Sequence, residues 1–301
     1  MKTSKSPLAV ACVAYKVAKQ SLPPYSHARS PHVFTLPQIV ACLVLKEFFT
    51  TDYRGIVAIL ADSSDIQKAL ELKEIPHFTT LQKASQRLTK QRIIEKLLKR
   101  ILALTIQKKT DKAAVNLAAI DGTGFESHHT SHYFIARRTQ GLKSQPRSML
   151  YTRFPKIGLV VDVASYLILA GIPDRGPRFD SVHFKPALGA AAKIAHIRTL
   201  VADAGYDSEA NHVCARRNYN IRAIIPAIQH RWKNSVPKSH YRKLMHTNFP
   251  KKIYRQRWQI ETTISMLKRH LGSCLRARNY WSQCREMLLR IFTHNVMVVL
   301  R

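Results

Sequence analysis

Residues 199–208 read TLVADAGYDS, an apolar run that stops at an aspartate, Asp203. A short apolar run bounded by turn-forming residues is typical of a buried β-strand, so we predict a strand over residues 199–202. Residues 118–124, AAIDGTG, repeat the pattern with Asp121. Each aspartate thus lies at the tip of a predicted strand, close to a glycine that permits another segment to approach.

The segments around these two strands predict a mixed sheet covered by helices. Long apolar stretches at 157–163 and 165–172 predict a hairpin, and residues 221–225 predict a further buried strand. Helical periodicity is found in three segments, residues 182–197, 208–217 and 254–271. Strands that alternate with helices in this order indicate an α/β fold.

The chain before this region has a different pattern. Residues 1–30 are basic and predict an N-terminal arm, and residues 31–111 are mostly helical in period. A capping box at 79–82 predicts the start of a short helix over Leu81–Leu88, whose polar face carries Gln and basic side chains. Such a helix fits a helix-turn-helix-like DNA reader, and it equally fits a solvated helix face.

Charge narrows the class of partner. There are 49 Lys and Arg against 18 Asp and Glu, a formal net charge of +31. So large an excess of one sign repels itself unless a polyanion neutralises it, and nucleic acid is the natural candidate. A membrane surface is the competing partner, but the basic residues are scattered rather than gathered beside one amphipathic anchor.

The cysteines and the N-terminus indicate the compartment. Five cysteines, widely spaced and without a Cys-x-x-Cys pair, argue against a disulfide framework or a zinc site and favour a reducing interior. The first residues faintly resemble a signal peptide but lack a clear cleavage site, so we expect no export.

Asp121 and Asp203 suit a hard cation such as Mg²⁺, which prefers carboxylate oxygens, waters and substrate phosphates. Two such ions side by side stabilise both the attacking and the leaving oxygen at phosphorus. The alternative is that both aspartates only shape turns. Asp162, inside the predicted hairpin, is a reserve candidate for the metal site, whereas Asp180 and Asp207 are expected to cap helices.

One face of the predicted helix over residues 254–271 gathers an acid among phosphate-binding groups. At 3.6 residues per turn, Tyr254, Arg257, Glu261 and Lys268 fall on the same side. A metal-binding carboxylate flanked by groups that grip phosphates fits this pattern. An ordinary i,i+4 salt bridge between Arg257 and Glu261 fits it as well.

These spacings resemble a known family. Tyr254, Arg257, Glu261 and Lys268 are similar to the Y-R-E-K signature of bacterial and archaeal insertion-sequence transposases. Residues 201–208 and 120–123 resemble the family's second and first aspartate motifs, and the resemblance covers about residues 112–275. Arg255-Gln256 departs from the usual pattern, in which Glu or another polar residue stands between the Tyr and the Arg.

The resemblance implies a ribonuclease-H-like fold, here residues 112–301 with a short insertion at about 226–250. It implies that Asp121, Asp203 and Glu261 hold two Mg²⁺ or Mn²⁺ ions. It further implies that the signature's Tyr, Arg and Lys contact phosphates of transposon ends. The reaction would be cleavage of double-stranded DNA at terminal inverted repeats and strand transfer into target DNA, by a homodimer.

The residues leave two alternatives to this function. One is a ribonuclease-H-like endonuclease that joins nothing, and the other is an inactive, transposase-derived DNA-binding protein. A basic run that includes Arg137 and Arg138, and ends at Lys156, is expected to line a DNA channel, although a solvated loop explains it too.

Overall fold

A computed structural model describes residues 3–29, 31–108, 114–127, 154–176, 178–228 and 236–300. Arg137 and Arg138 lie outside these ranges. Within them, no helix combines the length and the apolar character needed to cross a bilayer.

The centre of the molecule is a five-stranded sheet in the order β4-β3-β1-β5-β6. Its strands are β1 (Ala114–Gly124), β3 (Pro155–Asp162), β4 (Ile168–Arg175), β5 (His196–Ala202) and β6 (Arg222–Ile224). Strand β3 is antiparallel to both of its neighbours, whereas β1, β5 and β6 pair in parallel. This order and these directions confirm the expected ribonuclease-H-like mixed sheet.

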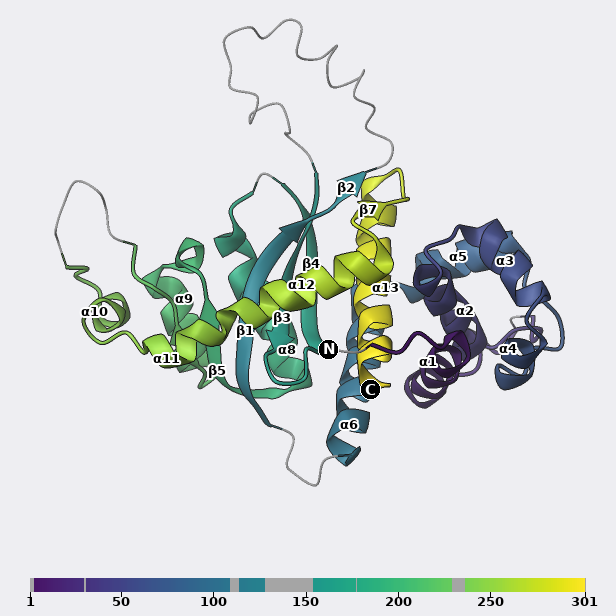
Figure 1. The fold of residues 1–301 in the computed structure, drawn as a ribbon, viewed down its shortest axis with the longest axis horizontal. Helices are drawn as coiled ribbons and strands as arrows, with labels where there is room; N and C mark the ends of the chain where they lie inside the picture. The colour runs from purple at the N-terminus through teal and green to yellow at the C-terminus, as the bar shows by residue number, and fades with distance from the viewer. Residues whose placement is uncertain are drawn as a thin grey trace, which may run out of the picture.

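Helices cover both faces of the sheet (Figure 1). Helix α8 (Phe184–Ile194) packs on β3 and β4, and α12 (Trp258–Leu271) crosses β1 on the other face. The shorter elements after β5 are α9 (Glu209–Val213), α10 (His240–Thr247) and α11 (Lys251–Tyr254). Strands β2 (Glu126–Ser127) and β7 (Cys274–Leu275) form a separate parallel pair.

The helical layer precedes the sheet in sequence. It consists of α1 (Pro7–Ser21), α2 (Leu36–Phe48), α3 (Tyr53–Ala61), α4 (Ser64–Ala69), α5 (Phe78–Leu88) and α6 (Gln91–Lys108). The expectation of an arm over residues 1–30 is wrong for α1, because one side of this helix is buried, mainly against α2. Its alanines and valines pack there, while its lysines remain on the outside.

Helix α5 begins earlier than the sequence predicts. His77 is its N-cap, and the ring accepts a hydrogen bond from the Thr79 backbone N–H, so no capping box forms at 79–82. The capping box is instead at Thr35 and Gln38, where α2 begins. The expected polar face of α5 is exposed, at Gln82, Lys83, Gln86 and Arg87.

The long C-terminal helix α13 (Tyr280–Val299) was not predicted. It contacts α2, α6 and β4, and it lies beside α6, between helices α1 to α5 and the sheet (Figure 1). The Asn295 side chain accepts a hydrogen bond from the Ile168 backbone N–H at 2.9 Å and donates to the Ile168 carbonyl at 2.8 Å, as a neighbouring strand would. Polar residues within α13 are buried and partnered, which masks its apolar face in the sequence.

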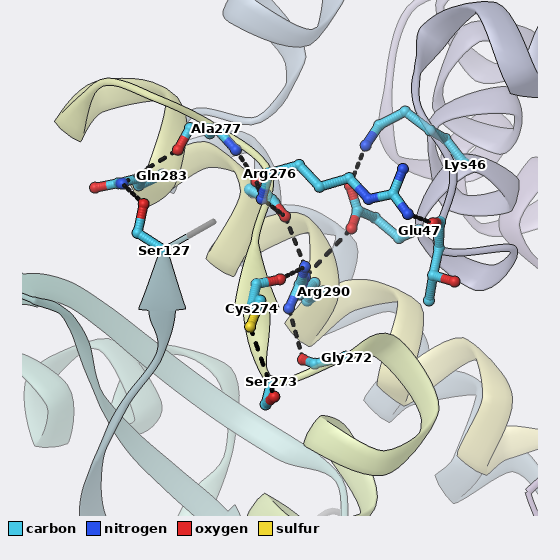
Figure 2. A network of polar contacts seen from close by, with 12 residues as sticks. Lys46, Glu47, Ser127, Gly272, Ser273, Cys274, Arg276, Ala277, Gln283 and Arg290 are labelled. Carbon is cyan, nitrogen blue, oxygen red and sulfur yellow. Dashed lines mark hydrogen bonds and ion pairs between the residues drawn. The ribbon is translucent and has the colours of Figure 1, made fainter. Parts of the chain in front are cut away.

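Buried charges join α13 to the helical layer and to the end of α12 (Figure 2). The Arg290 guanidinium forms an ion pair with Glu286 at 2.6 Å and with Glu47 of α2 at 3.4 Å. It also donates to the carbonyls of Gly272 and Cys274, each at 2.7 Å, just after α12. Arg290 therefore fixes the direction in which the chain leaves α12.

We predict that Arg290→Ala destabilises the fold by about 3–5 kcal/mol, because it leaves Glu286 buried without its cation, while Glu47 keeps only Lys46. Arg285→Ala, on the same helix, is the matched control, since among the described residues its guanidinium donates a hydrogen bond only to Ser282. The free energy of unfolding from urea titration measures both. Equal stability of the two variants would contradict the assigned role of Arg290.

Candidate active site

Asp121 and Asp203 lie side by side because β1 and β5 pair in parallel. Ile120 is opposite Ala202 in this register, so the next residue along each strand is an aspartate. The sequence predicted that the first strand ends at Asp121, whereas β1 continues to Gly124. The sequence prediction of two acids on neighbouring strands is otherwise confirmed.

Asp121 is largely buried beside another acid. One carboxylate oxygen accepts a hydrogen bond from the Gly122 backbone N–H at 2.8 Å, and the side chain is 19% exposed. Burial is the main cause that raises the pKa of the Asp121 carboxyl to about 6; the charges of Asp203 and Asp180 also raise it, while the Gly122 hydrogen bond and Arg257 lower it. The site therefore disfavours a second negative charge unless a cation is present.

Asp203 contributes an oxygen that lacks a partner. Its Oδ1 atom is buried and has no hydrogen-bond partner among the described residues. The hydroxyl of Tyr206, which is completely buried, also lacks one. Burial, together with the charges of Asp180, Asp121 and Asp203, raises the pKa of the Tyr206 hydroxyl, so it stays protonated.

Arg257, at the start of α12, links Glu261 of that helix to Asp121. The Arg257 guanidinium is 2.6 Å from a Glu261 carboxylate oxygen and 3.6 Å from one of Asp121. The expected i,i+4 salt bridge therefore exists, and the same guanidinium also reaches the strand. Glu261 is the most exposed of the three acids, with 57% of its side chain accessible.

A groove runs from the end of β1 along α12. Gly122 and Thr123 line it on one side, and Glu261, Lys268 and Arg269 line it on the other, around a volume of about 550 Å³. The Lys268 ammonium lies 5.5 Å from the centre of the Phe125 ring. Tyr254, one helical segment earlier, packs edge-on against Phe249 at 4.9 Å. The lining of the groove thus combines an acid, Glu261, with two bases, Lys268 and Arg269.

The donor set fits a divalent cation in part. Two adjacent half-buried carboxylates, one with a buried and unpartnered oxygen, are the oxygen ligands that Mg²⁺ and Mn²⁺ prefer. Across the described ranges, however, no three His, Cys, Asp or Glu side chains are close enough to hold one ion. Glu261 does not join the two aspartates because it is paired with Arg257, whose guanidinium lies between Glu261 and Asp121.

Several expected roles are wrong. Asp162 is not near the site but closes the β3–β4 turn by accepting from the backbone of Ala164 and Ser165. Ser208, not Asp207, caps α9, and Asp207 is a buried partner of Arg242 at 2.8 Å.

Lys156 also differs from its expected place in a DNA channel. It is buried, and its ammonium lies 2.8 Å from Asp180. Asp180, expected as a helix cap, makes no capping hydrogen bond. Sequence reasoning did not predict that Lys156 and Asp180 lie beside Gly122. Tyr206 belongs to the segment that resembles the second aspartate motif, but its complete burial was not predicted.

A family model described as "Transposase DDE domain" matches residues 116–296. No curated protein matches the chain. A cryo-EM structure of a piggyBac transposase synaptic complex with hairpin DNA aligns with a TM-score of 0.46 and 10% identity, over 99% of this chain and 75% of that chain.

We predict that Asp121→Asn stabilises the metal-free protein at pH 7.5 but not at pH 4. The folded pKa of about 6 exceeds the ordinary value of 3.8, so the stability linked to the protonated carboxyl is present below pH 3.8 and is lost as the pH rises through 6. Asn removes that loss, worth on the order of 1–3 kcal/mol at neutral pH.

The measurement is thermal unfolding with a chelator at both pH values. Asp52→Asn is the opposite control, because backbone hydrogen bonds, first that of Gly55, lower the pKa of this exposed N-cap. Its removal should destabilise the protein at pH 7.5. A destabilising Asp121→Asn at pH 7.5 would contradict the electrostatic account.

Proposed function

The chain belongs to the transposase DDE-domain family, and on that premise we propose that Asp121, Asp203 and Glu261 are its metal-binding carboxylates. Membership makes the protein a DNA transposase, an enzyme that acts on DNA. Its proposed reaction is cleavage at the ends of a transposon followed by transfer of the freed strand into target DNA. The observation that supports the site is the pair of neighbouring aspartates with an unpartnered, buried oxygen.

The proposed cofactor is a pair of Mg²⁺ or Mn²⁺ ions. When bound, such ions supply an activated water or hydroxyl and stabilise the departing oxygen at phosphorus. Asp121 and Asp203 would hold them on the strand side. Glu261 would complete the set from α12 after its partner Arg257 turns towards a DNA phosphate.

The chain's own cations would orient the DNA. Lys268 lines the groove that begins at Gly122, and the Arg257 guanidinium lies 3.6 Å from Asp121, the residue before Gly122, so a bound phosphate would meet an ammonium in the groove and a guanidinium beside the strand. Arg binds a phosphate with two parallel hydrogen bonds, whereas Lys acts as a point charge. The Tyr254 hydroxyl would donate a further hydrogen bond to the phosphates. Arg137 and Arg138 are proposed as further DNA-binding residues.

The wider assembly is also part of the proposal. Double-stranded DNA with terminal inverted repeats and a target duplex are the proposed partners, bound by two protomers that bring the ends together. Helix α5, with its exposed polar face, is the proposed reader within residues 31–111. An endonuclease without strand transfer is the second candidate, and the joined products described next distinguish it.

We predict that Glu261→Gln abolishes Mn²⁺-dependent cleavage and joining of a labelled end duplex while leaving duplex binding within about twofold. Loss of an outer partner of a metal ligand typically costs 10–100-fold, so loss of a ligand should cost at least about 100-fold. Glu74→Gln, an exposed acid in the helical layer, is the matched control. Undiminished cleavage by Glu261→Gln would refute the site. Cleaved but never joined products from the unmodified protein would favour the endonuclease.

We predict that Lys268→Met weakens end binding and lowers the slope of log K against log salt by about 0.9, the loss of one phosphate contact. Methionine keeps the apolar stem over Phe125 and removes only the charge. Lys96→Met, an exposed lysine on α6, should leave the slope unchanged. Binding isotherms at several salt concentrations measure both, and an unaltered slope for Lys268→Met would remove this lysine from the interface.

A further inference from the structure

A pocket of about 360 Å³ lies where the end of α5, the start of α6 and the first turns of α13 meet. Tyr280 and Trp281, the first two residues of α13, line it together with Pro173 of β4. It shares no lining residue with the groove along α12. The metal-binding and phosphate-binding roles proposed above therefore do not involve this pocket.

Trp281 presents an accessible aromatic ring at this pocket. It is 70% exposed, although tryptophan is on average a highly buried residue. Cys284 and Leu288 follow at helical spacing, line the same pocket and are buried. Asn279 fixes the start of the helix, because its side chain accepts a hydrogen bond from the Ser282 backbone N–H at 2.9 Å. The indole is thus carried on a defined helical turn, and most of its surface is open to a planar ligand.

The Tyr280 ring extends this aromatic surface and carries a cation against it. Its centre lies 5.1 Å from that of the Trp281 ring, with the two planes inclined by 60°. The Arg175 guanidinium lies 4.1 Å from the Tyr280 ring centre. Burial is the main cause that raises the pKa of the Tyr280 hydroxyl, so the phenol stays protonated and can donate a hydrogen bond.

The polar residues that line the pocket are basic or neutral. Lys90, exposed just before α6, and Arg285 of α13 line it, and no acid is among the described residues of the lining. Asp174 follows Pro173 in β4, but its carboxylate already lies 2.9 Å from His183. The pocket therefore favours a negatively charged ligand over a neutral or cationic one.

An aromatic surface beside two cations fits a nucleotide. Any base can stack on an aromatic face, while a guanidinium or ammonium binds the phosphate. A base inside a duplex is covered by its neighbours, so the ligand that fits is an unpaired nucleotide. A segment of a second copy of this strongly basic chain is disfavoured by the same cations.

The pocket is near enough to the groove along α12 for one DNA molecule to contact both. Ser273 lines the groove, and Tyr280 comes seven residues later in the chain. Seven residues span at most about 25 Å when fully extended. At about 3.4 Å per base step, this is no more than roughly seven steps along a strand. A nucleotide displaced from a duplex in the groove is therefore within reach of the pocket.

We propose that this pocket binds one unpaired nucleotide of the DNA substrate, with the base stacked on Trp281 and the phosphate at Arg285 and Lys90. The inference rests on the proposed function for its ligand, DNA, but it does not depend on the metal-binding carboxylates. Stacking is tolerant of base identity, so the pocket selects DNA that is locally unpaired rather than a particular sequence.

The test is DNA binding by fluorescence anisotropy, with a chelator present so that no cleavage occurs. The labelled probes are a matched duplex, the same duplex with one unpaired thymine, and a short oligothymidine. Trp281→Ala should weaken binding of both probes with unpaired bases by about 5- to 150-fold, the effect of losing one stacked base, and leave matched-duplex binding unchanged. Trp281→Phe, which keeps an aromatic face, should restore most of this affinity. Phe179→Ala removes an exposed aromatic ring outside the pocket and is the matched control.

Arg285→Ala tests the phosphate contact independently of the aromatic ring. It should lower the slope of log K against log salt for oligothymidine by about 0.7, the loss of one phosphate contact on a single strand. An unaltered slope would remove Arg285 from the proposed site. Thermal unfolding of each variant confirms that it is folded.

The probes separate this inference from the proposed function. If Trp281→Ala binds the unpaired probes as tightly as the unmodified protein does, the pocket assignment is overturned, and binding of the matched duplex leaves the proposed function standing. If the unmodified protein binds none of the probes, both are overturned. An altered oligomeric state of Trp281→Ala in sedimentation, without weaker binding of the unpaired probes, would assign the pocket to a second copy of the chain and overturn the proposal as well.

Discussion

The candidate site depends on the parallel register of β1 and β5. With Ile120 opposite Ala202, Asp121 and Asp203 become neighbours at a position from which water is largely excluded. Burial and the nearby charge of Asp203 both disfavour the ionised form of Asp121. A cation close to Asp121 favours that ionised form. In this structure the Arg257 guanidinium is the cation near Asp121, and in the proposed reaction a divalent metal ion replaces it.

The same site is supported from the far side of the molecule. Arg290 connects α2 to the segment that follows α12, and its guanidinium lies 5.6 Å from the Phe125 ring centre. Lys268 lies over the same ring, so one aromatic side chain contacts both the buried charge network and the basic wall of the groove. The helical layer thereby fixes the angle of α12, which carries Glu261 and begins directly after Arg257, relative to β1.

Charge is arranged on two length scales. The excess of 31 positive charges produces a field that attracts a polyanion over distances set by the ionic strength. Near Asp121 the local arrangement differs, because the charges of two other acids, Asp203 and Asp180, act on this carboxyl. A strongly basic chain thus gathers several of its 18 acids at one place.

The sequence by itself determined the elements that depend on local pattern. Apolar runs ending at Asp121 and Asp203 gave the two acid-bearing strands, and helical spacing gave the shared face of Arg257 and Glu261. Tertiary structure alone decided which segments meet. Asp180 lies against Gly122 because elements more than 50 residues apart in sequence pack together. In α13, buried polar residues interrupt the apolar pattern, and their partners lie on distant segments. Periodicity reports which side of an element is buried, but not what it is buried against.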